Sequence, residues 1–280
     1  MKTKLRFFII LIVILLALPN NIFAKKILSE ERTNEFVDEN LMNIEKINLD
    51  IISKEDKQAL KNKIESLSDK KFDDFIVNSL ENSNDKIKLK NNLRQLGVEL
   101  NLNNNNNYTL CSVPSYDAEI YVTSVRRGSD SYYRLISYVN LKKSEIRPGS
   151  PDIIAMYFDS NKAEYYSYNT STNTSLNTGI NATRGTLVFN LYDNRMGTST
   201  EYVSVYVTPR HISSNNWIDF GSDWTHTYRK TSVSGISPSA EITFIGGSIV
   251  GGSVGVSVNI DLSVESSWKL ADTNAVNANY

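Results

Sequence analysis

The segment VGVSVNIDLSV, residues 254–264, alternates aliphatic residues with small or polar residues at every position. An alternation with a period of two places the apolar side chains on one face of a strand and the polar side chains on the other. The segment therefore predicts an extended ribbon that has different environments on its two sides. The pattern alone leaves open whether the apolar face meets a protein core or lipid.

Other segments of the chain upstream of this ribbon also have the character of strands. Residues 187–191 and 203–207 alternate in the same way, and residues 133–141 keep most apolar side chains on one face. The run PDIIAMYF, residues 151–158, is apolar almost throughout, which is typical of a strand covered on both faces. Further candidates are residues 118–125, 164–168, 225–233 and 240–244. About nine strands favour an antiparallel sandwich, and the polar segment 169–183 is expected to form a long loop.

Residues 25–107 differ in composition from the rest of the chain. They hold 14 basic and 16 acidic residues but no Tyr, Trp, His or Pro, whereas all 15 tyrosines and all three tryptophans follow them. Apolar residues recur there at the spacing of amphipathic helices. Ser53 and Ser68 precede two such stripes as N-cap residues, and Gly97 follows a third, where it can adopt a left-handed conformation. These signals predict a small region of charged helices.

The domain organisation follows from the beginning of the chain and from an asparagine tract. Three basic residues, an apolar stretch over residues 7–18 and a small residue at Ala24 are the pattern of a secretory signal peptide. Five consecutive asparagines favour turns and suggest a flexible joint. The predicted fold class is α+β in two parts, a small N-terminal helical region followed by an antiparallel all-β sandwich. The predicted divisions are a signal peptide (1–24), a charged helical leader or pro-region (25–100), an Asn-rich linker (101–107) and the sandwich domain (108–280).

Residues that could support catalysis or metal binding are sparse. Cys111 is the only cysteine, so an internal disulfide is excluded, and we expect a small buried side chain there. The two histidines, His211 and His226, have no partner at the spacing of a metal site, and His226 between two threonines is typical of a hydrogen-bonded sheet residue. A thiol–imidazole pair has no local motif to support it. We therefore predict no metal, no cofactor, no catalysis and, given a net charge of −1, no nucleic-acid partner.

The ribbon at 254–264 is the candidate for membrane contact. A membrane-crossing strand needs about 9–11 residues, which the ribbon provides. The predicted membrane-contact residues are its aliphatic positions and two apolar residues of the preceding loop: Val254, Val256, Val258, Ile260, Leu262, Val264, Ile249 and Val250. The same alternation fits a strand with one face on a protein core, so this second interpretation stays open.

Short motifs in both halves carry a resemblance to a known family. They are Leu67-Ser68-Asp69 with Phe72 and Phe75, Leu96-Gly97-Val98, Trp224 with Tyr228-Arg229-Lys230-Thr231-Ser232-Val233, and Ser267-Trp268-Lys269-Leu270. With an export signal and a Tyr- and Ser-rich β domain, the chain resembles the geobacillin-like family, large secreted antibacterial proteins of Gram-positive bacteria. The resemblance implies killing of related bacteria, with the option that a leader is removed first, and it brings no catalytic residues.

These observations lead to three hypotheses about function. The first is a secreted, bacteriocin-like antibacterial or membrane-active protein that acts without catalysis on the envelope of other cells. Its expected partners are the membrane or cell wall of the target cell, and self-association stays open. The alternative is a non-enzymatic cell-surface or carbohydrate-binding β module that depends on an exposed aromatic residue such as Trp217. The third is a hydrolase with dispersed acids such as Asp219 and Asp223, together with His226.

Overall fold

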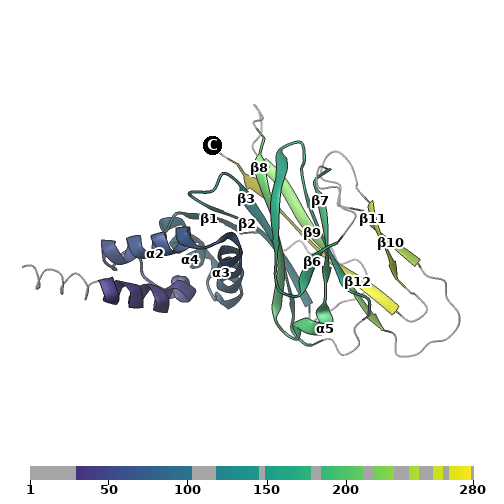
Figure 1. The fold of residues 1–280 in the computed structure, drawn as a ribbon, viewed down its shortest axis with the longest axis horizontal. Coiled ribbons are helices and arrows are strands. Elements are labelled where there is room, and N and C mark those ends of the chain that lie inside the picture. The colour runs from purple at the N-terminus through teal and green to yellow at the C-terminus, as the bar shows by residue number, and fades with distance from the viewer. Residues whose placement is uncertain are drawn as a thin grey trace, which may run out of the picture.

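A computed structural model describes most of the chain, and its elements are labelled in Figure 1. The described residues are 30–102, 118–144, 149–177, 184–210, 217–229, 240–245, 255–260 and 265–278. The predicted signal peptide and the asparagine tract lie outside these ranges. The same holds for Cys111, His211, Ile249, Val250, Val254, Leu262 and Val264.

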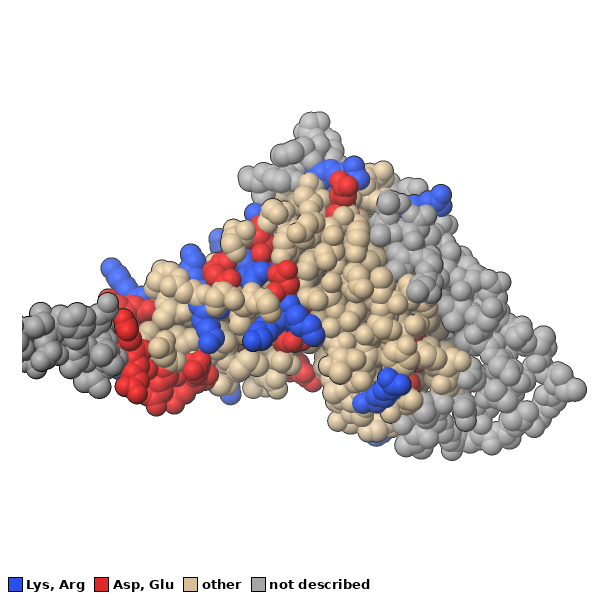
Figure 2. Space-filling model, in the orientation of Figure 1, with Lys and Arg blue, Asp and Glu red and all other residues tan. Residues whose placement is uncertain are grey.

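Helices occupy the N-terminal part of the described chain and lie at one end of the molecule (Figure 1). Residues 30–40 are helical, and they are followed by η1 (Leu41–Lys46), α2 (Lys54–Ser66), α3 (Asp69–Asn82) and α4 (Lys86–Gln95). Figure 2 shows that charged side chains crowd this region, whereas the visible face of the β structure is mostly uncharged. Among the described helices, none has both the length and the apolar character that crossing a membrane requires.

The helix boundaries confirm the capping signals in the sequence. Ser53 is the N-cap of α2, and its hydroxyl accepts a hydrogen bond from the backbone N–H of Asp56 at 3.0 Å. Ser68 stands at the N-cap of α3 but makes no hydrogen bond to the helix through its side chain. Gly97 follows α4 with φ of 83°, a left-handed conformation that ends the helix and that glycine adopts without strain.

Two antiparallel sheets and a separate hairpin form the rest of the described structure. Sheet A has the strand order β1-β2-β3-β8-β5, sheet B has the order β12-β9-β4-β7-β6, and β10 pairs with β11. A short helix, α5 (Asp193–Met196), follows β7. The strands are β1 (Val98–Leu102), β2 (Ala118–Arg127), β3 (Tyr133–Leu141), β4 (Asp152–Phe158), β5 (Ala163–Thr170), β6 (Thr174–Leu176), β7 (Thr186–Leu191), β8 (Thr200–Pro209), β9 (Trp217–Arg229), β10 (Ala240–Ile245), β11 (Gly255–Ile260) and β12 (Glu265–Asn277).

The two sheets enclose an apolar core, which confirms the predicted antiparallel sandwich. The alternating residues of β7 and β8 point into this core, and every residue of β4 is buried, as its apolar run predicted. The largest side chains between the sheets include Phe189, Phe220 and Trp224, each with none of its surface exposed. Burial of such alternating faces is the main source of stability for a sandwich without a disulfide.

Several strand boundaries differ from the sequence prediction. The segment 169–183 was expected to be a loop, but β5 continues to Thr170 and β6 occupies Thr174–Leu176. The ribbon expected over 254–264 is a strand from Gly255 to Ile260, and a separate strand, β12, begins at Glu265. β12 lacked an apolar alternation because polar groups take core-side positions. Its Asp272 carboxylate accepts a hydrogen bond from the Val122 backbone N–H of sheet A at 2.8 Å.

The helical region is joined to sheet A rather than hanging free from it. β1 lies before the asparagine tract, includes Asn101 and Leu102 of the predicted linker, and pairs with β2 along its whole length. A second apolar core unites α2, α3 and α4 with the outer face of sheet A. Its buried contributors from the sheet are Val98, Leu100, Val125, Ile136, Tyr138 and Tyr202. The predicted removal of the helical region stays a prediction, but the region shares its hydrophobic core with the sandwich.

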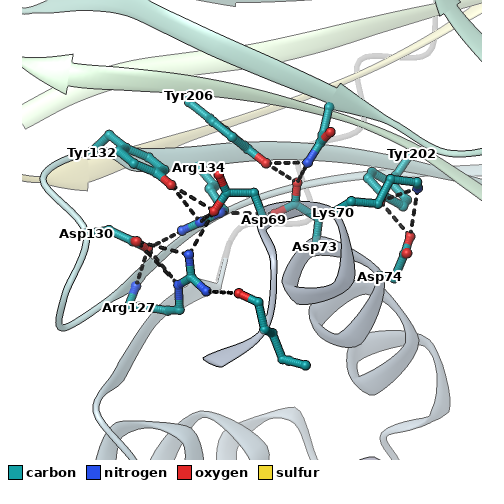
Figure 3. A network of polar contacts seen from close by, with 12 residues as sticks. Asp69, Lys70, Asp73, Asp74, Arg127, Asp130, Tyr132, Arg134, Tyr202 and Tyr206 are labelled. Carbon is teal, nitrogen blue, oxygen red and sulfur yellow. Dashed lines mark hydrogen bonds and ion pairs between the residues drawn. The ribbon is translucent and has the colours of Figure 1, made fainter. Parts of the chain in front are cut away.

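A buried network of charges also joins α3 to sheet A (Figure 3). The guanidinium of Arg134, on β3, has no exposed surface and forms ion pairs with Asp69 at 2.6 Å and Asp73 at 3.1 Å on α3. It also pairs with Asp130 in the turn before β3. Arg127, at the end of β2, pairs with Asp69 at 2.8 Å and with Asp130 at 3.1 Å. Three carboxylates therefore surround two guanidinium groups that lie almost wholly out of water.

Aromatic side chains complete the environment of this network. The Arg134 guanidinium lies 4.7 Å from the ring centre of Phe72 and 5.0 Å from that of Tyr206. The Tyr206 hydroxyl donates a hydrogen bond to Asp73 at 2.6 Å, and the Asn169 amide donates another at 3.1 Å. Burial raises the pKa of Asp73 to about 6, although the Tyr206 hydroxyl and the Arg134 charge both favour its ionised form. The network therefore keeps Asp73 buried, although burial disfavours the ionised form of its carboxyl group.

Replacement of Arg134 by methionine should strongly destabilise the fold. The variant Arg134→Met keeps an apolar stem but leaves the buried Asp73 and Asp130 without their shared counter-charge. We expect a loss of about 3–5 kcal/mol in the free energy of unfolding, measured by chemical denaturation. The control is Lys63→Met, which removes an exposed ion pair with Asp38 (N–O distance 3.5 Å) and should cost less than about 1 kcal/mol. Equal losses in the two variants would contradict the importance of the buried network.

The elevated pKa of Asp73 predicts a specific pH dependence. A carboxyl group whose pKa is raised by folding binds its proton more tightly in the folded state, so its contribution to stability falls as pH rises. The free energy of unfolding of the wild type minus that of Asp73→Asn should therefore decrease between about pH 4 and about pH 6, by roughly 3 kcal/mol. Denaturation curves across this range measure it, and a flat difference would show that Asp73 titrates normally.

Candidate functional site

A groove of about 360 Å³ opens where the helical region meets the ends of two strands of sheet B. We call it the Trp217 groove. One wall comes from α4 and β1, and the other comes from the first residue of β9 and the last residues of β12. Its lining residues are Lys90, Arg94, Glu99, Leu100, Asn101, Ser124, Tyr133, Trp217, Val276 and Asn277.

Backbone pairing and side-chain hydrogen bonds between β1 and β12 hold these walls together. Trp217 begins β9 and lies directly opposite Asn277, the last residue of β12. Asn101 on β1 donates a hydrogen bond through its side-chain amide to the backbone carbonyl of Ala275 on β12, at 2.5 Å. This contact ties sheet A to sheet B at the floor of the groove. The site is thus built by segments that are far apart in the sequence.

Trp217 presents a large aromatic surface to solvent. Its neighbours Ile218 and Phe220 point into the core between the sheets, so the alternation of β9 turns Trp217 to the other side. The side chain is 47% exposed, which confirms the prediction that it is an exposed aromatic residue. Leu100, Tyr133 and Val276 add apolar surface to the groove beside it. An exposed indole in a concave site is typical of a ligand contact.

Two buried polar atoms in the groove lack a hydrogen-bond partner among the described residues. They are the hydroxyl of Ser124, a residue that is 1% exposed, and the side-chain carbonyl of Asn277. A buried polar group without a partner costs about 1–3 kcal/mol, so most such groups in proteins are satisfied. A donor and an acceptor with no protein partner in one concave site therefore point to a polar ligand or to water.

Charged groups flank the groove on the side of the helical region. Lys90 and Arg94 project from α4, and Glu99 projects from β1. Glycoside hydrolysis requires two carboxyl groups that flank the scissile bond. Glu99 is the only acidic residue among the described residues that line the groove. The described lining therefore presents two cationic groups and one carboxylate beside the aromatic surface of Trp217.

A second polar cluster lies fully buried at one end of sheet B. The Asp152 carboxylate accepts hydrogen bonds from Trp224 Nε1 at 2.9 Å and from the backbone N–H of Thr227 at 2.8 Å. It also lies 2.8 Å from His226 Nδ1, and Asp193 of α5 lies 3.7 Å from the same nitrogen. Burial raises the pKa of Asp152, while His226 and the backbone hydrogen bond act in the opposite direction.

The geometry of this cluster favours a structural role over a metal site. Asp152, Asp193 and His226 offer ligand atoms that lie within 4.8 Å of one another, close enough to surround a cation. However, both oxygens of Asp152 already accept hydrogen bonds, one from Trp224 and one from Thr227, and the imidazole lies 2.8 Å from the first of these oxygens. A cation would have to replace these donors, which are arranged to stabilise a carboxylate. His226 is therefore a hydrogen-bonded sheet residue, as its sequence context indicated.

The residues suggested for a hydrolase are not assembled into one site. Asp219, Asp223 and His226 all lie on β9, but successive side chains of a strand point to opposite faces. His226 shares the face of the core residue Trp224, and the two aspartates lie on the other face. Asp223 forms an ion pair with Lys269 at 2.5 Å, and Asp219 lies 3.8 Å from Lys162. Each acid is thus engaged in its own contact, away from the imidazole.

The residues predicted to contact a membrane fall on the β10–β11 hairpin or outside the described ranges. The register places Val256 opposite Phe244, Val258 opposite Ile242 and Ile260 opposite Ala240. The register therefore pairs apolar residues with apolar residues along the hairpin. Contact of these residues with a membrane stays a prediction.

The buried cluster generates a prediction about stability. Replacement of Asp152 by asparagine places an amide donor against groups that already donate, so at least one buried donor loses its acceptor. We expect Asp152→Asn to lower the free energy of unfolding by about 3 kcal/mol and to leave ligand binding at the Trp217 groove unchanged. Asp219→Asn, with an exposed side chain and a distant lysine, should cost less than about 1 kcal/mol. Loss of binding in Asp152→Asn without unfolding would contradict a purely structural role.

No protein-family model matches the chain, and no curated protein matches it. Among solved structures, it is similar to the sixth cohesin of scaffoldin B from Acetivibrio cellulolyticus, with a TM-score of 0.24 and 14% identity, over 33% of this chain and 76% of that one. A cohesin module of a family 33 glycoside hydrolase from Clostridium perfringens gives a TM-score of 0.27 and 8% identity, over 54% and 93% of the two chains. A structure concerned with Streptococcus parasanguinis adhesion by fimbriae gives 0.30 and 8%, over 62% and 92%. With TM-scores of 0.30 or less, a function for this chain has to rest on its own residues.

Proposed function

We propose that this chain is an extracellular, non-enzymatic carbohydrate-binding module and that the Trp217 groove is its binding site. The observation that carries the proposal is the combination of an exposed indole with two unsatisfied buried polar atoms in one groove. A sugar ring has an apolar face that can lie on an aromatic ring, and it carries hydroxyl groups that donate and accept hydrogen bonds at its edge. The groove offers a partner for each of these features.

The polar atoms of the groove match the needs of a saccharide. The Ser124 hydroxyl can donate or accept, and the Asn277 carbonyl can accept from a sugar hydroxyl. A volume of about 360 Å³ is at the small end of the range of ligand sites in proteins. The groove is also open to solvent, which suits a segment of a longer polysaccharide chain. We therefore infer that it holds a short stretch of a cell-surface or extracellular glycan.

The proposal assigns the helical region to the working protein. Lys90, Arg94 and Glu99 supply the charged wall of the groove, and Leu100 and Asn101 supply part of its floor. A product that lacked residues 25–107 would lose all of these groups. The hypothesis of a removable leader and the proposed binding site therefore exclude each other in the mature protein. Export through the predicted signal peptide is part of the proposal, because extracellular glycans are the expected ligands.

Antibacterial action through the β10–β11 hairpin is the other hypothesis for the same secreted protein. Its supporting observation is the register that pairs apolar residues of the two strands with one another. The binding proposal has more support, because it rests on side chains whose exposure, contacts and position are described. The resemblance to the geobacillin-like family stays a prediction.

Removal of the indole should abolish glycan binding. We expect Trp217→Ala to weaken binding to cell-wall and other extracellular polysaccharides by at least about tenfold, or about 1.4 kcal/mol. A glycan array followed by isothermal titration calorimetry on the best glycan measures this. The control is Tyr166→Ala, which removes a ring that is more exposed than that of Trp217 (61% against 47%), on β5 and outside the groove. Unchanged binding in Trp217→Ala, or the absence of any bound saccharide on the array, would overturn the proposal.

A further inference from the structure

The Trp217 groove has a strongly basic helix along one wall. α4 has the sequence KIKLKNNLRQ, which contains four cationic side chains and no acidic one. Lys86, Lys90 and Arg94 follow one another at intervals of four residues, so they share one stripe of the helix. The Lys86 ammonium lies 4.7 Å from the centre of the Tyr121 ring on β2, which shows that this stripe faces sheet A. The two following cations of the stripe line the groove.

The cations of the groove are not neutralised by the described residues around them. No described residue forms an ion pair or a side-chain hydrogen bond with Lys90 or Arg94, although such pairs are frequent elsewhere in the helical region. The acidic residue in the lining, Glu99, stands opposite Arg126 in the register of β1 and β2. Arg126 brings a positive charge of its own to that side, and its guanidinium donates a hydrogen bond to the Tyr133 hydroxyl at 3.2 Å.

The charge balance of the site is therefore positive. Glu99 and Arg126 offset each other, and the C-terminal end of α4 contributes a partial negative charge equivalent to roughly half an electron. Lys90 and Arg94 together exceed that contribution. A guanidinium group can hold a carboxylate through two parallel hydrogen bonds, and an ammonium group adds a strong point charge. The same groove thus offers an aromatic ring, neutral polar atoms and an anion-binding pair.

We propose that the ligand of the Trp217 groove is an acidic saccharide whose carboxylate is held by Lys90 and Arg94. This inference rests on the proposed function and names the class of sugar that the site selects. The ring of the sugar lies on Trp217, its hydroxyl groups meet Ser124 and Asn277, and its carboxylate points to α4. A neutral sugar of the same shape makes the first two sets of contacts and lacks the third.

The test compares acidic sugars with neutral forms of the same sugars. The probes are oligogalacturonate, a glucuronate-containing hyaluronan oligosaccharide and sialyllactose, each with its own methyl ester, titrated into the full chain by calorimetry. The ester keeps the ring and removes the charge. We expect at least one acid to bind about tenfold or more tightly than its ester, and this preference should shrink as salt is raised, because exposed charges are screened.

Substitutions on α4 locate the source of the preference. Arg94→Gln and Lys90→Gln should each weaken binding of the preferred acid by roughly threefold to tenfold, and the double variant should bind acid and ester alike. Binding of the ester should not change. Lys88→Gln is the matched control, because it removes the same charge from the same helix at a residue outside the groove lining. A preference that survives the double variant, or that is lost in Lys88→Gln, would overturn the assignment of the carboxylate site.

The outcomes separate this inference from the proposed function. If no acid is preferred over its ester while saccharides still bind in a manner that depends on Trp217, the acidic specificity is wrong and the binding module stands. If neither acids, esters nor neutral glycans bind, both proposals fall. In the last measurement, the full chain is titrated with an oligoglutamate peptide that carries the same charge as the preferred acidic saccharide. Its binding at the affinity of the preferred acid would show that the groove recognises an acidic peptide, and the saccharide assignment would be overturned.

Discussion

The position of the helical region depends on a guanidinium group that is wholly removed from water. Arg134 cannot be placed in the interior without partners, because an isolated buried charge costs far more than folding can supply. Its partners come from two directions, Asp130 beside it and Asp69 and Asp73 on α3. The aspartates therefore fix the position of α3 on sheet A. The Phe72 ring, which also belongs to α3 and packs against the guanidinium, restricts this position further.

α4 and β1 are held against α3 by the second apolar core, to which all three elements contribute. The buried amide of Asn92 on α4 donates hydrogen bonds to the carbonyl groups of Ile44 and Ile47, at 2.7 Å and 3.0 Å, which ties α4 to the segment before α2. The chain then turns at Gly97 and enters β1 as the edge strand of sheet A. The basic face of α4 is thereby held beside the open ends of β9 and β12. A charge network that has no contact with a ligand thus shapes the groove in which a ligand is expected.

Many local features of the fold could be predicted from the sequence. The alternation in β7 and β8, the fully buried character of β4 and the caps at Ser53 and Gly97 all agree with the structure. β1 was missed although Val98, Leu100 and Leu102 alternate with polar residues, because the segment has only five residues and directly follows a helix. β12 was missed because polar residues such as Asp272 take core-side positions and make their hydrogen bonds with distant strands.

The candidate site was only partly visible in the sequence. Trp217 could be named as an exposed aromatic residue, but its partners Ser124, Asn277, Lys90 and Arg94 could not, since nothing in their local sequence connects them. The residues predicted for membrane contact were chosen mainly from the longest alternation of apolar and polar residues, because such an alternation can be recognised within a single segment. The groove, in contrast, is lined by residues of six helices and strands that meet only in the folded structure. Its polar atoms matter because the fold leaves them without protein partners, and that depends on what surrounds them.

By itself, the sequence determined the kinds of elements, most of their positions and the contrast between a charged helical region and a Tyr-rich β domain. Periodicity and capping act between residues a few positions apart, so they can be recognised without knowledge of the fold. The tertiary structure alone decided that the two parts share a core and enclose a groove. Those features depend on contacts such as the one between Arg134 and Asp69, 65 residues apart, and on the pairing of Trp217 with Asn277. Such contacts form where burial, hydrogen bonding and charge compensation are satisfied together, which no single segment of the chain can specify.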